Sequence, residues 1–423
     1  MDASTLERRY LKINKKLGML TGVWPYQKHS TKWISRSIVI CLVLPTYLTQ
    51  YARLIVYPRM DIVLNDYPYL IVGFGIFVKF GNYFINESKL TSLVGKIYED
   101  WQNITSTDEY KIMLKYAERG VLSVILYTLH ISLCVFLFIC LPYVPPILDM
   151  VLPLNETREP LLIYPAYYGI DEKEYHSWIL AHMTVMVSIL CCVFCACDAN
   201  YVYAVQHACG LLAVTEYRFQ CACREVITQN ENEFVEAMKQ MYKNVSHSIQ
   251  GHQRAVQSVL NITDGKYHAA KNFSVCRYVR EITVAHDICM FITVGLLMIS
   301  ISASLLQIAE HEHDAMWLTN CMFFVAQLFH MLFLVIQGQF VLDSYDNLYS
   351  TICESTWYNS SCRTQALYIL ALRSSQSPPL LTAGGFITLN LKTFAEVTCR
   401  LLRNYLDLFK HFIPFTQDIP HFR

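Results

Sequence analysis

The chain has 423 residues, of which 54% are hydrophobic and only 16% carry a formal charge. Soluble domains carry charge on about 25% of their residues, so this composition excludes an ordinary soluble protein. The formal net charge is zero, which gives no indication of a nucleic-acid partner. Apolar runs of about 18 residues or more recur along the chain and predict an all-α polytopic membrane protein.

Seven transmembrane helices are predicted after a basic, polar tail over residues 1–33. The fourth is expected to continue as a helix beyond the membrane, to about residue 219. Lys79 lies near one end of the second span, where its long stem is expected to reach the membrane surface. In chain order the seven spans lie at about 34–54, 67–84, 121–143, 178–197, 288–308, 317–342 and within 379–410.

An odd number of spans places the two ends of the chain on opposite sides of the membrane. Lys and Arg are concentrated in 1–33 and in alternate loops, which predicts a cytoplasmic N-terminus and an extracellular C-terminus. Asn155 then lies in an outer loop, within an Asn-x-Thr sequence, and is the predicted glycosylation site. All sixteen cysteines fall in spans or on the cytoplasmic side, so no extracellular disulfide is expected.

The last apolar stretch carries a regular stripe of charge. Its charged residues recur every three or four positions, which places them on one face of a helix. A helix over 386–410 would be about 37 Å long, enough to cross a bilayer core of about 30 Å. It would either line a pore or lie as an amphipathic helix on a membrane or protein surface. The stripe consists of Lys392, Glu396, Arg400, Arg403, Asp407 and Lys410.

The sequence contains no motif typical of catalysis, cofactor binding or metal binding. Two histidines, His130 and His330, lie within predicted spans and are the candidates for a membrane enzyme. No carboxylate in a neighbouring span is expected beside them, so a structural role is favoured. Four cysteines have ligand-like spacing within an apolar span and are interpreted as core residues: Cys191, Cys192, Cys195 and Cys197.

The outer halves of four spans are rich in aromatic residues, Met and small polar residues. This composition suits a membrane-embedded pocket for a small apolar ligand, and equally an ordinary helix interface, which composition alone favours. The candidate ligand-binding residues are Phe74, Phe77, Val135, Phe136, Met183, Met186, Trp317, Asn320 and Phe324.

The segment 344–410 resembles the C-terminal signature of insect odorant receptors. Its elements occur in the family's order: a Ser-to-Leu stretch leading to a Trp-Tyr pair, a basic and Ser-Gln element before Pro, a Leu-Thr-Ala-Gly run and a closing Leu-x-Leu run. They are carried by Ser344, Leu348, Trp357, Tyr358, Arg373, Gln376, Pro378, Leu381, Thr382, Ala383, Gly384, Phe386, Leu389, Leu391 and Phe394.

The resemblance implies four subunits around a central pore that is lined by the seventh helix. Residues of about 219–286 and 344–373 would form a cytoplasmic anchor. The chain then divides into 1–343, with the ligand pocket, and 344–423, with the anchor and pore helices. The pore-lining candidates become Glu396, Arg400, Arg403, Asp407 and Lys410.

Such chains resemble tuning subunits, which assemble with a shared coreceptor into an odorant-gated, non-selective cation channel. The resemblance therefore implies a non-enzymatic, multi-pass protein of the plasma membrane, in the dendrite of an olfactory neuron. A gustatory-type channel of the same superfamily is the first alternative, although the seventh span lacks its typical Gln. A G-protein-coupled receptor is the second, and the basic loops oppose its orientation.

Overall fold

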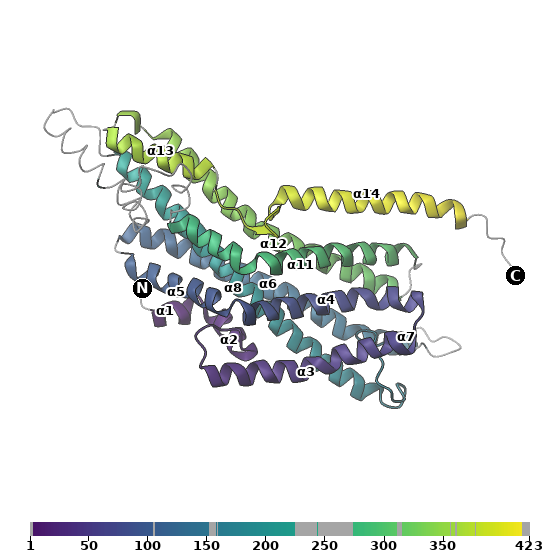
Figure 1. Cartoon of the computed structure of the whole chain (residues 1–423). Helices are drawn as coiled ribbons and strands as arrows, with labels where there is room; N and C mark the ends of the chain where they lie inside the picture. Colours follow the sequence, from purple (N-terminus) through teal and green to yellow (C-terminus); the bar gives the residue numbers. More distant parts are fainter. Residues whose placement is uncertain are drawn as a thin grey trace.

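The computed structural model describes residues 3–104, 106–151, 158, 160–224, 243, 274–310, 315–355, 357–359, 362–376 and 378–416. Long helices run side by side as a bundle over most of this part of the chain (Figure 1). The all-α polytopic membrane fold predicted from composition is confirmed. By length and composition, six helices in the described part are able to cross a membrane: α3 (His29–Val56), α4 (Met60–Ile85), α6 (Thr107–Cys140), α8 (His176–Arg224), α11 (Ser274–Glu310) and α12 (Ala315–Glu354).

Shorter elements join and flank these helices. The amphipathic helix α14 corresponds to the seventh predicted span. It is not counted among the six apolar helices because it carries the charged stripe. In chain order these elements are α1 (Ala3–Arg9), α2 (Lys12–Thr21), α5 (Glu87–Asn103), η1 (Leu141–Tyr143), α7 (Val144–Val151), η3 (Trp357–Asn359), α13 (Cys362–Gln376), β1 (Thr382–Ala383), β2 (Ile387–Thr388) and α14 (Leu391–Thr416).

Three of the helices are much longer than a bilayer is thick. α8 has 49 residues, α11 has 37 and α12 has 40, and a rise of about 1.5 Å per residue makes each at least about 55 Å long. The apolar pattern predicted an extension of the fourth span, and the resemblance implied long extensions of the fourth, fifth and sixth spans; all three helices have one. The extended ends lie together with α13 at one end of the bundle (Figure 1).

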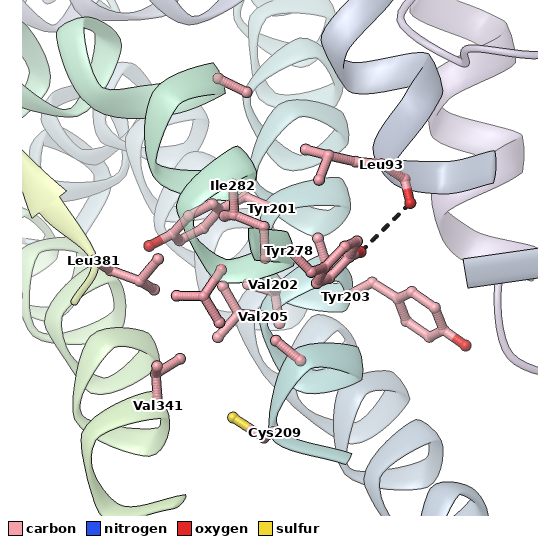
Figure 2. Close-up of a cluster of buried hydrophobic side chains, with 14 of the residues drawn as sticks. Leu93, Tyr201, Val202, Tyr203, Val205, Cys209, Tyr278, Ile282, Val341 and Leu381 are labelled. Carbon is pink, nitrogen blue, oxygen red and sulfur yellow. Dashed lines mark hydrogen bonds between the residues drawn. The ribbon is translucent and has the colours of Figure 1, made fainter. Parts of the chain in front are cut away.

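The bundle is held together by a continuous apolar core that follows α8. Tyr201 and Val205 of α8 are buried against Ile282 of α11 and the neighbouring helices (Figure 2). Tyr278 of α11 is also buried, and its hydroxyl donates to the carbonyl of Leu93 in α5, at 3.4 Å. The phenol rings of Tyr201 and Tyr278 therefore contribute to the packing of the core. The hydrogen bond of Tyr278 also joins α11 to the shorter helix α5.

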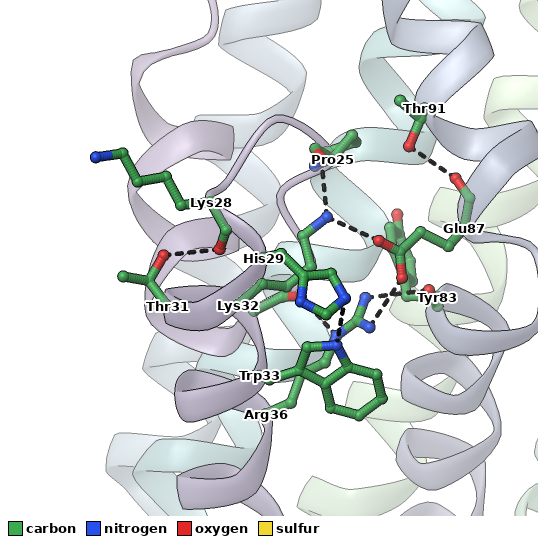
Figure 3. Close-up of polar contacts among 11 residues, drawn as sticks. Pro25, Lys28, His29, Thr31, Lys32, Trp33, Arg36, Tyr83, Glu87 and Thr91 are labelled. Carbon is green, nitrogen blue, oxygen red and sulfur yellow. Dashed lines mark hydrogen bonds and ion pairs between the residues drawn. The ribbon is translucent and has the colours of Figure 1, made fainter.

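A cluster of charges, buried at Lys32 and Arg36 and partly exposed at Glu87, joins the N-terminal segment to α3, α4 and α5. Arg36 donates to Glu87 at 2.9 Å and to the carbonyls of Gly22 at 2.9 Å and Tyr83 at 3.3 Å, while Lys32 donates to the other oxygen of Glu87 at 2.8 Å (Figure 3). Gly22 has φ 76°, a left-handed conformation that favours glycine. Arg36 is thus fixed by three segments of the chain, and it fastens them to one another.

The stretch before α14 differs from the prediction of one helix starting at Phe386. It forms a hairpin in which Thr382 pairs with Thr388, and Gly384 and Gly385 have φ values of 68° and 77°. Two successive left-handed residues end any helix, so α14 begins only at Leu391.

Candidate ligand-binding cavity

A cavity of about 220 Å³ lies among the six apolar helices. Its walls come from α3, α4, α6, α8, α11 and α12, with Ile163 and Tyr164 from the loop before α8. Most of its lining is aliphatic or aromatic, as in protein sites for small apolar ligands. Lining residues include Ile71, Val72, Ile76, Ile131, Val135, Phe138, Val187, Leu190, Leu296, Leu297 and Phe323.

Close contact between α3 and α4 shapes one side of this cavity. The hydroxyl of Tyr47 donates to the carbonyl of Gly73 at 2.7 Å, and both residues line the cavity. A Cβ atom at position 73 would lie 2.7 Å from the Tyr47 ring. Glycine is needed here because the ring lies directly against the backbone of α4.

A network of ionisable side chains lies at one end of the cavity, where Lys79 and His330 are part of the lining. Lys79 Nζ lies 2.6 Å from both carboxylate oxygens of Asp198, 3.2 Å from Nε2 of His330 and 4.2 Å from the centroid of the Phe194 ring. Tyr127 donates to Asp198 and lies 3.1 Å from Nδ1 of His330. Lys79 and Asp198 are each 2% exposed, so each charge depends on the other for compensation.

One assignment of protons satisfies every member of this network. Protonated Lys79 donates to ionised Asp198 and to Nε2 of a neutral His330. The Nδ1–H of His330 then donates to Tyr127, whose hydroxyl donates to Asp198. The network is therefore closed and has no net charge, which is how ionisable groups are tolerated within a membrane.

Two predictions about these residues are wrong. Lys79 does not reach toward the membrane surface, because Asp198 of α8 binds its ammonium group inside the bundle. His330 does have a carboxylate in a neighbouring helix, with Nδ1 4.0 Å from Asp198. Asp198 was placed beyond the membrane end of the fourth span, and packing brings it level with the second and sixth.

The nine predicted ligand-binding residues are placed in several different environments. Val135 lines the cavity. Phe74, Phe77 and Phe136 lie on the outside of the bundle, with exposed fractions of 49%, 61% and 60%. The other five do not line the cavity: Met183, Met186 and Asn320 are buried, Trp317 is half-buried, and Phe324 packs on the main core.

The sequence contained a signal for which side of α4 faces the cavity. Lys79 is charged and has to face the interior, and residues three, four and seven positions before it lie on the same face of a helix. Those positions are Val72, Gly75 and Ile76, and all three line the cavity. Phe74 and Phe77 lie between them and face outwards.

Of the five pore-lining candidates, Glu396, Arg400 and Arg403 are exposed along α14. The opposite side of this helix carries Phe394, Val397 and Leu401, which pack on the core. Asp407 and Lys410 lie within α14, outside the residues whose side chains are described, and Asn155 lies outside the described residues altogether. In the described part of the chain no group of three or more His, Cys, Asp or Glu residues is placed to hold a metal ion.

The fold and the cavity together define a class, that of polytopic helical membrane proteins with an apolar cavity inside the bundle. Residues 60–399 match a family model described as 7tm Odorant receptor. This match covers well over half of the chain, which therefore belongs to the odorant receptor family. The resemblance seen in the C-terminal segment is confirmed.

Individual relatives agree with this assignment. Over 78 residues the chain is 31% identical to the putative odorant receptor 83c of Drosophila melanogaster, an alignment covering 18% of this chain and 20% of that protein. Two solved structures of the insect olfactory receptor OR5 from Machilis hrabei, one in complex with eugenol, align with 96% of this chain. The alignments have TM-scores of 0.70 and 0.68 and cover 100% and 99% of the Machilis chains. Because the sequence identities are only 12% and 14%, the likeness is one of fold.

Proposed function

We propose that this odorant receptor binds a small volatile ligand in the cavity among its six apolar helices. The observation that carries the proposal is an apolar space of about 220 Å³ with a closed polar network at one end. An engineered cavity of about 150 Å³ binds benzene, so this one suits somewhat larger single-ring or short-chain compounds. Eugenol, the ligand named for the Machilis receptor, is a reasonable first probe.

We further propose that the ligand gates a non-selective cation channel whose pore is lined by α14. The chain would act as a tuning subunit in a heterotetramer with the shared coreceptor, in the plasma membrane of an olfactory neuron. Glu396, Arg400 and Arg403 are exposed on α14 and would face the conduction path with Asp407 and Lys410. Acidic groups there would favour cations.

The β1–β2 hairpin offers a physical route from the cavity to the pore. Asp287 of α11 accepts hydrogen bonds from Thr382 at 3.1 Å and from the amide of Gly385 at 3.0 Å. Gln339 of α12 accepts from the amide of Leu391, at 3.2 Å. Because α11 and α12 also line the cavity, a ligand that changes their separation would move the first turn of α14. Binding would then shift the population toward the open state by its differential affinity.

The test is odorant-evoked current in cells expressing this chain with and without the coreceptor. Val135→Trp fills part of the cavity and is expected to abolish the response, whereas Phe136→Trp, its exposed neighbour on α6, is the matched control and should respond normally. Equal responses from the two variants would refute the cavity as the ligand site. Current from this chain without the coreceptor would refute the tuning-subunit role.

Orientation has an independent test in glycan mapping. A glycan at Asn155 alone is expected for a cytoplasmic N-terminus. A glycan at Asn86 or Asn103, which also stand in Asn-x-Ser/Thr sequences, would contradict that orientation.

A further inference from the structure

The cavity wall contains polar side chains that lack hydrogen-bond partners. Gln327 of α12 lines the cavity and is 4% exposed, and neither its amide nitrogen nor its amide oxygen has a partner. Ser300 of α11 also lines the cavity, is fully buried, and has an unpaired hydroxyl. Buried polar groups are nearly always hydrogen-bonded in folded proteins, so both groups require a partner from within the cavity.

The two side chains belong to the cavity by their helical positions. Phe323, Gln327 and His330 follow one another at steps of four and three residues on α12, and all line the cavity. On α11, Leu297 and Ser300 follow the same spacing. The unpaired groups therefore lie on the cavity-facing sides of two neighbouring helices.

The charged network does not compete for the same ligand group. All three N–H groups of Lys79 are directed to Asp198 and His330, and His330 is bonded on both ring nitrogens. Lys79 is the only lysine or arginine among the described lining residues, and Asp198 already neutralises it. A carboxylate ligand therefore finds no free cation, so polar recognition depends on unpaired neutral groups. These include Gln327, Ser300 and the amide oxygen of Gln50 on α3, and of the two amides Gln327 has both its nitrogen and its oxygen unpaired.

We propose that the cavity selects ligands that carry a hydroxyl group, which Gln327 and Ser300 bind. A hydroxyl both donates and accepts, so it can donate to the amide oxygen of Gln327 while it accepts from Ser300 or from the amide nitrogen. An ether or ester only accepts, and it leaves the amide oxygen unpaired. A hydrocarbon leaves every one of these groups unpaired. The order of potency is therefore alcohol, then ether, then hydrocarbon.

This inference rests on the proposed ligand site, and its test separates the two. The probes are two sets matched in number of non-hydrogen atoms: benzyl alcohol, anisole and ethylbenzene, and hexanol, methyl pentyl ether and heptane. Two readouts are used, evoked current with the coreceptor and ligand-induced thermal stabilisation of the purified full chain. The alcohol of at least one set is expected to act at a concentration about tenfold or more below its ether, because one unpaired buried group has an effect of this size.

Variants assign the effect to the two side chains. Gln327→Met conserves volume and should bring the alcohol to the potency of the ether, while the hydrocarbon response is retained or strengthened. Ser300→Ala should have a smaller effect in the same direction. Ser302→Ala is the matched control, because its hydroxyl is exposed and bonded to the carbonyl of Met298 at 2.9 Å.

The outcomes distinguish failure of hydroxyl selection from failure of the cavity as the ligand site. Equal potency of alcohol and ether would overturn hydroxyl selection, and an alcohol advantage that survives in Gln327→Met would overturn its assignment to Gln327. Val135→Trp would still abolish the response in that case, and the cavity would stand as the ligand site. Responses that persist in Val135→Trp would overturn the cavity itself, and silence of both sets in both readouts would overturn both proposals.

Discussion

The buried ion pair between Lys79 and Asp198 predicts a pattern of stabilities that an exposed pair would not produce. Asp198→Asn keeps the shape of the side chain but leaves the ammonium of Lys79 without a counter-charge in a 2% exposed position. Lys79→Met has the converse effect on the carboxylate. Combining the two substitutions removes both charges and leaves a neutral amide in place of the carboxylate, beside Tyr127, which still offers it a hydroxyl.

The magnitude follows from the contacts that are lost. Lys79 lies 2.6 Å from both carboxylate oxygens, and leaving one member of such a buried pair uncompensated costs about 3–5 kcal/mol. Each single variant is therefore expected to lose about that much stability. Replacing a buried pair by neutral groups is often close to neutral, so the double variant should be more stable than either single one.

The assay is thermal unfolding of the purified chain and its variants in one detergent, with surface expression as a second readout. Lys111→Met is the control, since its pair with Asp108 is 69% and 57% exposed and is worth less than about 1 kcal/mol. A double variant that loses as much as the two single variants together would refute the reasoning. So would single variants that unfold like the control.

Three further predictions concern the hairpin, the N-terminal cluster and α14. Gly338→Ala places a Cβ 1.7 Å from the carbonyl oxygen of Leu389, so the hairpin has to shift, at a cost of about 1–3 kcal/mol, measured by thermal unfolding. Glu87→Gln leaves Lys32 and Arg36 without their shared acceptor charge and is expected to cost about 1–2 kcal/mol, since Glu87 is partly exposed. If α14 lines the pore, Glu396→Gln lowers the calcium-to-sodium permeability ratio, read from reversal potentials.

Each of these predictions has a control in the same molecule. Gly295→Ala is the control for the hairpin, because a Cβ atom at position 295 would meet nothing within 4 Å. Equal unfolding temperatures for Gly295→Ala and Gly338→Ala would contradict the close approach to Leu389. For the N-terminal cluster, Lys111→Met is again the control. If Glu87→Gln unfolds at the same temperature as Lys111→Met, the cluster contributes little to stability. Asp346→Asn changes an exposed acid on α12, and an equal effect on permeability would contradict a specific role of Glu396.

The sequence predicted the helical membrane fold because hydrophobic length is a local property of the chain. It also predicted one face of α14, since charges at steps of three and four residues fall together on any helix. The start of α14 was missed. Gly384 and Gly385 adopt left-handed conformations within a hairpin that Asp287 fixes, and Asp287 is far away in the sequence.

The cavity was largely decided by tertiary structure. Periodicity gives the faces of one helix, but it does not give the rotation of that helix against its neighbours, so it could not show that Phe74 and Phe77 lie on the outside of the bundle. The pairing of Lys79 with Asp198 joins residues 119 positions apart, and no local pattern encodes that distance. The sequence by itself thus determined that the chain enters a membrane as helices, because burial of apolar side chains depends on composition. Only packing decided which side chains meet inside the bundle, and therefore what the cavity is able to bind.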